Sequence, residues 1–364
     1  MKRVLQVTGG LNTGGLETVA MNIVRNSDKE KIKYDFLVYD NREGDYEKEA
    51  RLFGCKVFHI KRGRGSLNLY NSIKHIIMNY GPYDVVHSHT YFNSGIVMLA
   101  AYKCNVPIRI AHAHSIKRRG DDRFIKKTKY HFLRLMMRRC CTNYVACSLD
   151  AGEYVFGKDI FDKCGLIFPN LIDVKKYAYS NENKSIIRKE LNISNDSFVI
   201  GNVGRLTVEK NQTFLLNVFS RIVANIPNSV LVIVGDGELK NDLKKQAENL
   251  RISDKVIFTG TRKDVGCLMS VFDVFVFPSI HEGFGIVAIE AMANGLKCVC
   301  EQNSVVAQLK ALSNCIAVNG FELDNWCNKV IDQLNKRSGV CPADIYDYDY
   351  QNYKSYICKL YQVR

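Results

Sequence analysis

The sequence lacks any uninterrupted run of about 20 apolar residues, so it offers no candidate for a helix that crosses a membrane. The short apolar run at residues 1–7 becomes rich in glycine at once, which predicts a first β-strand and not a signal peptide. The glycines that follow do not spell G-x-G-x-x-G, which argues against a nicotinamide-dependent dehydrogenase. From these absences we expect a cytoplasmic protein built around buried strands.

Cysteine, by contrast, is plentiful, with 13 residues in the chain. Most lie in apolar segments, and their spacing does not repeat the paired pattern of a zinc site. Cys140 and Cys141 are adjacent, and Cys298 and Cys300 stand two residues apart in a strand-like run. We expect reduced, buried thiols and neither a disulfide framework nor a zinc site.

Length and charge divide the chain into two parts. Its 364 residues exceed one typical domain and suit two, and a hydrophobic content of 46% supports sizeable cores. The net charge of +14 is uneven, because residues 1–172 hold 28 basic and 16 acidic side chains while the remainder is close to neutral. A basic first half suits nucleic acid, an anionic membrane or a phosphorylated ligand.

Strands that alternate with helices predict parallel sheets, in which ligands bind beyond the carboxyl ends of the strands. The first strand, at residues 4–8, leads into a glycine-rich turn at residues 9–15. Such a turn presents backbone N–H groups to an anion or a polar ligand. His89 and His114 stand at the ends of later strands, where a structural and a functional role fit the pattern equally well.

Residues 275–295 are the most informative stretch. Residues 275–277 predict a buried strand, and an almost wholly apolar helix starts at Ile286. Glu282 lies in the glycine-containing loop between them, and Glu290 lies in the middle of the helix. A buried, unpaired carboxylate is costly, so Glu290 needs a hydrogen-bonding partner, either structural or a ligand. Two carboxylates at such a turn can accept hydrogen bonds from the hydroxyls of a sugar.

A second loop between a strand and a helix carries basic residues. The strand predicted at residues 198–203 is followed by Arg205 and Lys210. Arg can grip phosphate oxygens with two hydrogen bonds and Lys adds a point charge, so this pair suits a diphosphate. An ordinary charged surface loop is the alternative.

These residues together resemble one family. The string P-S-x-x-E-G-F-G-x-x-x-x-E-A-M-A-x-G, with seven residues between Glu282 and Glu290, resembles the E-x7-E signature of retaining glycosyltransferases of family 4. Arg205 and Lys210 match the G-R-x-x-x-x-K motif of that family. The resemblance implies the GT-B fold, which is α/β with two Rossmann-like parallel-sheet domains facing across a cleft. We expect an N-terminal acceptor-side domain, a C-terminal nucleotide-sugar-binding domain and a C-terminal helix that packs back on the first domain, at residues 1–170, 171–340 and 341–364.

The resemblance also implies roles for single residues. In the family, the residues that match Arg205 and Lys210 hold the diphosphate of the donor, and the acid that matches Glu290 accepts hydrogen bonds from the ribose. Glu282 is expected to orient the donor sugar and stabilise the transition state, and not to act as a covalent nucleophile. The other positions implied for the donor site are Gly14, Gly15, Arg262, Gly283, Phe284 and Gly285.

A histidine of the family lies close to the reacting sugar, and it matches His114, with His112 as the alternative that the resemblance does not separate. After Gly295 the resemblance weakens, because Lys297 replaces a proline and residues 305–312 offer no glutamate. One face of the expected donor pocket therefore departs from the family pattern.

The implied reaction is transfer of a sugar from a nucleotide-sugar donor, expected to be a UDP-sugar, with retention at the anomeric carbon. No metal or other cofactor is expected, because Arg205 and Lys210 would stabilise the leaving diphosphate. The only D-x-D string, Asp347-Tyr348-Asp349, lies near the C-terminus and away from any predicted strand end. The expected acceptor is a lipid-linked glycan of capsule, exopolysaccharide or lipopolysaccharide assembly.

Residues 117–139 are the most basic stretch, with ten Lys and Arg residues. Phe124, Phe132 and Leu135 recur within it at near-helical spacing. The pattern suits an amphipathic helix on an anionic membrane, and hence a peripheral position at the inner face of the plasma membrane. A solvated charged face is the alternative, and nucleic acid is not expected because no nucleic-acid motif accompanies the charge.

Other functions stay open at this point. A nucleotide-sugar epimerase or a sugar phosphorylase shares the fold, and turnover of the donor without an acceptor would reveal it. A catalytically silent nucleotide-sugar-binding module should lack one of the four charged motif residues, and the sequence keeps all four. A dehydrogenase could use Asp40 as a ribose acid, but it would not explain the second domain.

Overall fold

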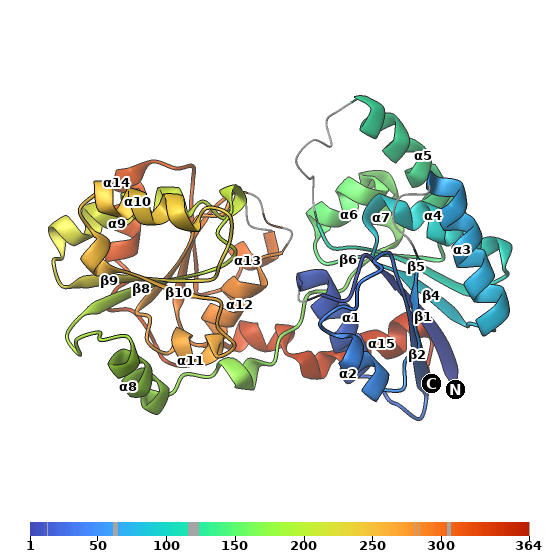
Figure 1. Ribbon diagram of the computed structural model, residues 1–364, viewed down its shortest axis with the longest axis horizontal. Helices are drawn as coiled ribbons and strands as arrows, with labels where there is room; N and C mark the ends of the chain where they lie inside the picture. The colour runs from blue at the N-terminus through green and yellow to red at the C-terminus, as the bar shows by residue number, and fades with distance from the viewer. Residues whose placement is uncertain are drawn as a thin grey trace. The chain divides into compact units, whose positions relative to one another are not determined.

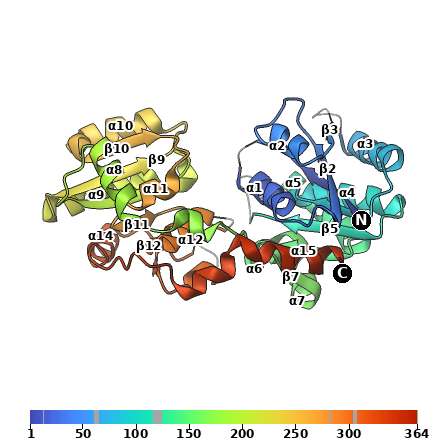
Figure 2. The same cartoon turned by 90° about the horizontal axis from the view of Figure 1, so that it is seen from below.

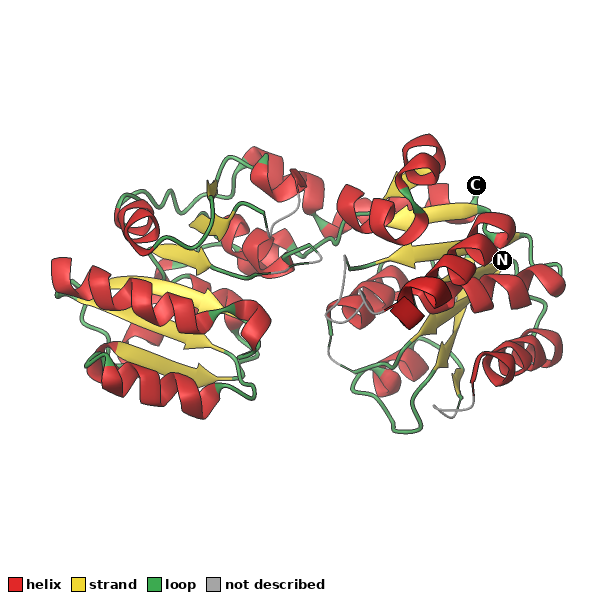
Figure 3. Cartoon of the chain, turned by 90° about the horizontal axis from the view of Figure 1, so that it is seen from above, coloured by secondary structure: helices red, strands yellow, loops and turns green. Residues whose placement is uncertain are grey.

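The computed structural model describes residues 1–12, 14–60, 65–115, 124–280, 282, 284–303 and 307–363. The chain divides into two compact units, of which the first comprises Met1–Leu171 with Tyr350–Arg364 and the second comprises Ile172–Asp349. Each unit is a parallel sheet with helices on both faces (Figure 1, Figure 3). No helix in the described ranges is long and apolar enough to cross a membrane.

Seven parallel strands form the sheet of the first unit, in the order β3-β2-β1-β4-β5-β6-β7. The central strand β1 is covered on both faces, and its residues Val4, Leu5 and Val7 are fully buried, as expected for a parallel sheet. The chain changes direction across the sheet between β1 and β4, which is where such folds bind ligands. The strands are β1 (Lys2–Thr8), β2 (Ile32–Val38), β3 (Val57–His59), β4 (Val85–Ser88), β5 (Ile108–Ala113), β6 (Asn143–Ala146) and β7 (Gly165–Ile167).

The helices of the first unit cover the two faces of this sheet. Helix α1 packs beside α15 on one face, and α4 packs between α3 and α5 on the other (Figure 1, Figure 2). The helix α15 therefore joins the last residues of the chain to the sheet of its first residues. The helices are α1 (Gly15–Arg25), α2 (Glu47–Leu52), α3 (Gly65–Tyr80), α4 (Ser94–Lys103), α5 (Phe124–Cys140), α6 (Leu149–Phe156), α7 (Lys158–Cys164) and α15 (Tyr353–Tyr361).

Six parallel strands form the sheet of the second unit, in the order β10-β9-β8-β11-β12-β13. Helices α9, α10 and α14 lie on one face, and α8, α11 and α12 lie on the other (Figure 1). The strands are β8 (Phe198–Val203), β9 (Ser229–Val234), β10 (Val256–Gly260), β11 (Val274–Phe277), β12 (Lys297–Glu301) and β13 (Cys315–Val318). The helices are α8 (Asn181–Glu190), α9 (Gln212–Asn225), α10 (Lys240–Asn249), α11 (Val265–Met269), α12 (Ile286–Ala293), α13 (Ala307–Lys310) and α14 (Leu323–Ile331).

Two expectations from the sequence need adjustment. The cysteines form no disulfide, but only six of the 13 are buried, and Cys164 is exposed. The C-terminal segment is divided, because a 3₁₀ helix at Ala343–Tyr348 belongs to the second unit and only the chain from Tyr350 groups with the first. The strand predicted at 198–203 has the predicted bounds.

Candidate functional site

The two charged motifs of the second unit stand on neighbouring strands. Strand β8 pairs with β11 in parallel, so the loops that follow these strands emerge at the same edge of the sheet. The backbone N–H of Ile280 donates to the carbonyl of Glu209 at 2.8 Å. The amide of Asn202 donates to the carbonyl of Val276, also at 2.8 Å. The first bond holds the loop before α9 against the loop before α12, and the second joins strands β8 and β11 beneath these loops.

Lys210 and Glu282 are brought together across 72 residues of chain. The Lys210 Nζ donates to Glu282 Oε1 in an ion pair, and it lies 5.3 Å from the centroid of the Phe277 ring. The two side chains keep 25% and 10% of their surface exposed, so solvent and ligands can reach the pair. Because the carboxylate already compensates the ammonium charge, a diphosphate at this site would compete with Glu282 for Lys210.

Arg205 stands at the start of the loop that ends with Lys210. Its side chain is exposed, and within the described part of the chain its guanidinium makes no hydrogen bond or ion pair. Its backbone carbonyl accepts a hydrogen bond from Gln212 Nε2 at 3.2 Å, which fixes the loop. Arg205 therefore offers five unengaged donors beside a second cation, as recognition of a phosphate requires.

The N-terminus of α12 contributes backbone donors at the same edge. Gly285 precedes the helix with φ 80°, and a Cβ there would meet Leu309 at 3.0 Å and Phe277 at 3.3 Å, so only glycine suits the position. No side chain in the described residues caps this helix, which leaves the N–H groups of its first turn to an anion. Phe284 is 3% exposed and packs against Tyr348, so it anchors the loop. Gly283 lies outside the described residues.

Glu290 has the hydrogen-bonding partner that its position in an apolar helix demands, and the partner is Tyr177. The Tyr177 hydroxyl donates to Glu290 Oε1 at 2.6 Å, and the amide of Asn294 holds the Tyr177 carbonyl at 2.6 Å. Glu290 keeps part of its surface exposed, but the protein packs densely around the carboxyl, and this desolvation raises its pKa above the ordinary value. Nothing in the local sequence around Tyr177 indicates this contact, because it spans 113 residues.

Arg262 is engaged with two carboxylates of its own unit. It donates to Asp264 at 2.8 and 2.7 Å and to Glu190 at 2.5 and 3.2 Å. These partners raise the pKa of the guanidinium further above its ordinary value. A side-chain contact of Arg262 with a nucleotide would therefore require exchange of these pairs, and the backbone of its loop is the better candidate.

The D-x-D string lies closer to the site than expected from the sequence. Tyr348 packs on Phe284 of the glycine loop with ring centroids 5.9 Å apart, because the 3₁₀ helix that ends at Tyr348 folds against α12. The prediction that this string lies away from a strand-end loop is therefore wrong. Asp349, however, is only 6% exposed and forms a backbone bridge with Ile172.

In the first unit, the glycine loop leads into α1 as predicted. Gly14 is the residue before the helix and Gly15 is its first residue. A Cβ on Gly14 would lie 2.5 Å from Glu17 Oε2, so the side chain of Glu17 folds back over the glycine. Gly14 and Glu17 are therefore in contact where the glycine-rich segment enters α1.

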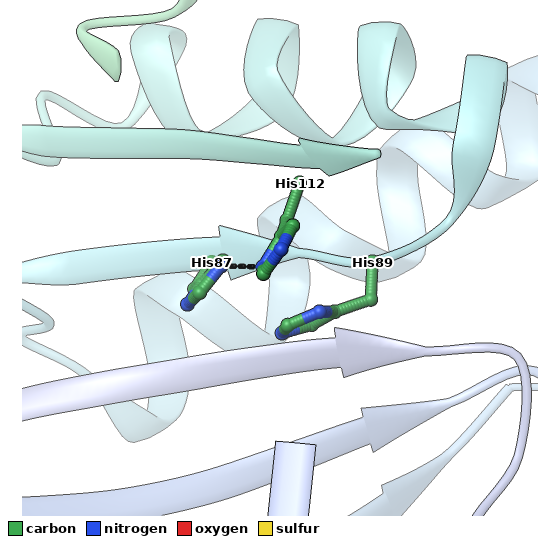
Figure 4. A group of neighbouring side chains, drawn as sticks. All are labelled: His87, His89 and His112. Carbon is green, nitrogen blue, oxygen red and sulfur yellow. Dashed lines mark hydrogen bonds between the residues drawn. The ribbon is translucent and has the colours of Figure 1, made fainter. Parts of the chain in front are cut away.

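The histidines of the first unit gather at the ends of β4 and β5. His112 is a residue of β5 and only 1% exposed, whereas His114 lies one residue beyond the strand and keeps part of its surface exposed. Of the two alternatives left by the sequence, His114 is therefore the one that a ligand can reach. His89 Nδ1 and His114 Nε2 are 2.7 Å apart. His87 Nε2 and His112 Nδ1 are 3.2 Å apart, and this pair is joined by the dashed line in Figure 4.

Three of these imidazoles are also the one group in the described ranges with the spacing of metal ligands. Nitrogens of His87, His89 and His112 lie within 4.8 Å of one another. Burial lowers the pKa of all three well below the ordinary value, so they are neutral near pH 7. His87 was not among the residues predicted for the site, although the two H-x-H strings at consecutive strand ends place all four rings on one face.

Family models match most of the described sequence. The model of Glycosyltransferase Family 4 matches residues 13–175, and the model of Glycosyl transferases group 1 matches residues 183–319. The chain is 33% identical over 301 residues to the Bacillus subtilis protein named "Putative glycosyltransferase EpsF", and the match covers 82% of this chain and 78% of that protein. It is 29% identical over 267 residues, 72% of this chain and 66% of the other, to an Escherichia coli UDP-Gal:alpha-D-GlcNAc-diphosphoundecaprenol alpha-1,3-galactosyltransferase.

Solved structures identify the fold. The crystal structure of Anabaena HepE in complex with UDP-glucose superposes with a TM-score of 0.81 over 100% of both chains, at 18% sequence identity. Identity this low shows the fold alone. The fold is GT-B, with two parallel α/β sheets of seven and six strands, as the sequence motifs predicted.

The raised pKa of Glu290 predicts that its ionised carboxylate lowers the stability of the folded protein at neutral pH. Above pH 7 the buried carboxylate is ionised at a cost, and Gln would keep the acceptor for Tyr177 without the charge. Glu290→Gln should therefore raise the thermal midpoint at pH 7.5, by roughly 2–4 °C for each kcal/mol of desolvation cost removed. Near pH 4 the Glu290 carboxyl of the folded parent is protonated and carries no desolvation cost. The difference in thermal midpoint between Glu290→Gln and the parent should therefore vanish at that pH.

Glu248→Gln is the matched control, because Glu248 is exposed on α10 of the same unit. It should leave the midpoint unchanged at both pH values. A Glu290→Gln variant that is less stable than the parent at pH 7.5 would show that the ionised carboxylate stabilises the fold, contrary to this account.

Proposed function

The chain belongs to glycosyltransferase family 4, and we propose that it transfers a sugar from a UDP-sugar to a lipid-linked glycan with retention at the anomeric carbon. The product would be a cell-surface polysaccharide or its precursor. The names of its relatives support this proposal. The Escherichia coli relative uses UDP-Gal and an acceptor on diphosphoundecaprenol, and HepE binds UDP-glucose.

The observation that carries the proposal is the convergence of Arg205, Lys210 and the N-terminus of α12 at one sheet edge. When the bond between the anomeric carbon and the diphosphate breaks, the electron pair leaves with UDP, and negative charge develops on the leaving phosphate oxygen. Preorganised cations and backbone N–H groups stabilise such charge most effectively when they need not move during the reaction. This arrangement can serve the role that a metal ion serves elsewhere, so we propose a metal-independent reaction.

The remaining groups are assigned by their chemistry. An ionised carboxylate only accepts hydrogen bonds, so Glu290, on the helix that faces the same loop, suits the two ribose hydroxyls. Glu282, once Lys210 turns to the diphosphate, is free to accept from a sugar hydroxyl. On the family resemblance, His114 and the loop of Gly14 and Gly15 are also assigned to the donor sugar. The oxygen of the acceptor hydroxyl forms the new bond to the anomeric carbon, and its proton passes to the oxygen of the leaving diphosphate.

A lipid-linked acceptor requires approach to a membrane, and α5 offers a surface for it. Phe132 and Leu135 are 59% and 42% exposed on this helix, and Lys129 and Arg139 are exposed beside them. Not every cation of the predicted patch is available, because Arg134 donates to the carbonyls of Val155 and Tyr154 and Arg138 pairs with Asp159. Residues 117–123 lie outside the described residues.

Removal of one side chain that donates hydrogen bonds to the diphosphate should slow the reaction strongly. Arg205→Ala should lower kcat/KM at least about 100-fold, by comparison with the loss of one donor from an oxyanion site. The assay is release of UDP in the presence of a lipid-linked acceptor. Lys245→Ala, which removes an exposed cation on α10 of the same unit, is the control and should leave the rate unchanged. Activity of Arg205→Ala close to that of the parent would exclude the diphosphate role.

Chelation tests whether the cations suffice without a metal. Treatment with EDTA should leave the transfer rate unchanged, because no step of the proposed reaction uses a metal. A loss of rate that only Mg²⁺ or Mn²⁺ restores would contradict this proposal, and it would direct attention to the aspartates beside Tyr348.

Binding to vesicles tests the membrane surface. The protein should sediment with vesicles that contain anionic phospholipid at low salt, and it should be released as salt screens the charge. Phe132→Ser with Leu135→Ser should weaken this binding about tenfold or more, because two exposed apolar side chains would no longer enter the interface.

The paired variant Leu52→Ser with Leu67→Ser is the matched control, because these leucines are 88% and 72% exposed elsewhere on the same unit. It should bind vesicles as the parent does. Equal effects of the two pairs, or no binding at low salt, would exclude α5 as the membrane surface.

A further inference from the structure

Four histidines, a glutamine and a tyrosine form one continuous chain of hydrogen bonds in the first unit. The strands β1, β4 and β5 are neighbours, and Gln6 of β1 lies in register with His87 of β4. His89, His112 and His114 follow at two-residue steps on β4 and β5 or just beyond their ends, so all these side chains point to one face. Helix α15 covers that face and adds the hydroxyl of Tyr361, 355 residues away from Gln6.

The first branch of the chain runs from Gln6 to His114. Gln6 Oε1 lies 2.7 Å from His89 Nε2, and His89 Nδ1 lies 2.7 Å from His114 Nε2. An amide oxygen can only accept, so His89 Nε2 carries a proton and donates it to Gln6. Because burial keeps His89 neutral, its Nδ1 has no proton and must accept. His114 is therefore the donor, with its proton on Nε2.

The second branch runs from Gln6 to His112. Gln6 Nε2 donates to the Tyr361 hydroxyl at 3.0 Å, and that hydroxyl lies 2.9 Å from His87 Nδ1. The Tyr361 oxygen accepts from the amide, and its own proton can go to His87 Nδ1, with the hydroxyl of Tyr34 as the competing acceptor. His87 then donates from Nε2 to His112 Nδ1 at 3.2 Å, which is the bond drawn in Figure 4.

We propose that Gln6, His89 and Tyr361 are positioning residues that hold His114 in the tautomer with its proton on Nε2. The inference rests on the proposed function only in giving His114 a role at the donor sugar. With the proton on Nε2, neutral His114 has only an acceptor at Nδ1, which is buried in this structure, so it would accept from a sugar hydroxyl only once the donor site opens to it. The single amide of Gln6 sets the direction of both branches, because it accepts on one side and donates on the other.

A metal ion in the same cluster is the competing explanation, and the hydrogen bonds argue against it. His87 and His89 use both ring nitrogens in the chain, and His112 uses Nδ1. Of the six ring nitrogens of these three histidines, only His112 Nε2 has no hydrogen-bond partner within the described part of the chain. A metal ligated by all three rings would have to break hydrogen bonds that His87 and His89 already make.

The tautomers can be read without any measurement of activity. In the full-length protein with ¹⁵N-labelled histidine, long-range ¹H–¹⁵N correlation spectra should show His87, His89, His112 and His114 all protonated on Nε2, with single His→Gln variants giving the assignments. A proton on Nδ1 of His114, or a mixture of tautomers in the parent protein, would overturn the inference.

Removal of one hydroxyl tests the role of Tyr361. Tyr361→Phe should release the Gln6 amide, give His114 a mixture of tautomers and lower kcat about tenfold with KM for the donor changed less than twofold. Complete inversion of a catalytic tautomer can cost about 10⁴-fold, so partial release should cost less. Tyr353→Phe is the matched control, because Tyr353 is equally buried on α15 but does not contact the histidines, and it should change neither spectrum nor kcat.

Rescue distinguishes positioning from packing. His89→Phe keeps the shape of the ring but cannot accept from His114, whereas His89→Asn can present an oxygen near the position of Nδ1. Asn should therefore recover more of kcat than Phe, and equal rates for the two variants would contradict positioning.

Stoichiometric binding of added Zn²⁺ with shifts of the His87, His89 and His112 signals would also overturn the inference. If His114→Ala is fully active while the tautomers are as predicted, the role of His114 in the proposed function fails and the chain of bonds stands.

Discussion

The parallel pairing of β8 with β11 is the constraint on which the donor half of the site depends. It brings the loop with Arg205 and Lys210 beside the loop with Glu282, and it aims α12 from the same edge. Neither loop could bind a diphosphate well alone, because one supplies cations and the other supplies a helix N-terminus. The Lys210–Glu282 ion pair joins the two loops, and it holds the ammonium group of Lys210 at the edge of the sheet.

Much of this half could be predicted from the sequence, because its signals are local. The apolar run before Pro278, the glycine at the start of α12 and the spacing of the charged residues all act within one strand–loop–helix unit. What could not be predicted depends on contacts between distant segments. The sequence shows that Glu290 needs a partner, but Tyr177 is identified only when the chain from 172 onward folds over α12. From the sequence, Arg262 is a cation that could contact a nucleotide. Only the folded structure shows that it donates to Glu190, 72 residues away.

The first unit gives the same lesson from another side. A run of basic residues predicts a charged surface that is free to bind, yet Arg134 donates to carbonyls at the end of α6 and Arg138 pairs with Asp159. Those carbonyls are available because the last turn of a helix has no partner for them within the helix. The four histidines could be placed on one face from their spacing alone. Their protonation could not, because it depends on Gln6 and on a hydroxyl from the last helix of the chain.

The most direct test of the account is calorimetric titration of UDP into the full-length protein and two variants that divide the ion pair. Lys210→Gln should weaken UDP binding about 10–100-fold, since one hydrogen bond to a charged group contributes roughly 1.5–3 kcal/mol. Glu282→Gln should leave the affinity unchanged or increase it, because Lys210 no longer has to leave a carboxylate. Unchanged affinity in Lys210→Gln, or an equal loss in both variants, would contradict a diphosphate site at the edge of β8 and β11.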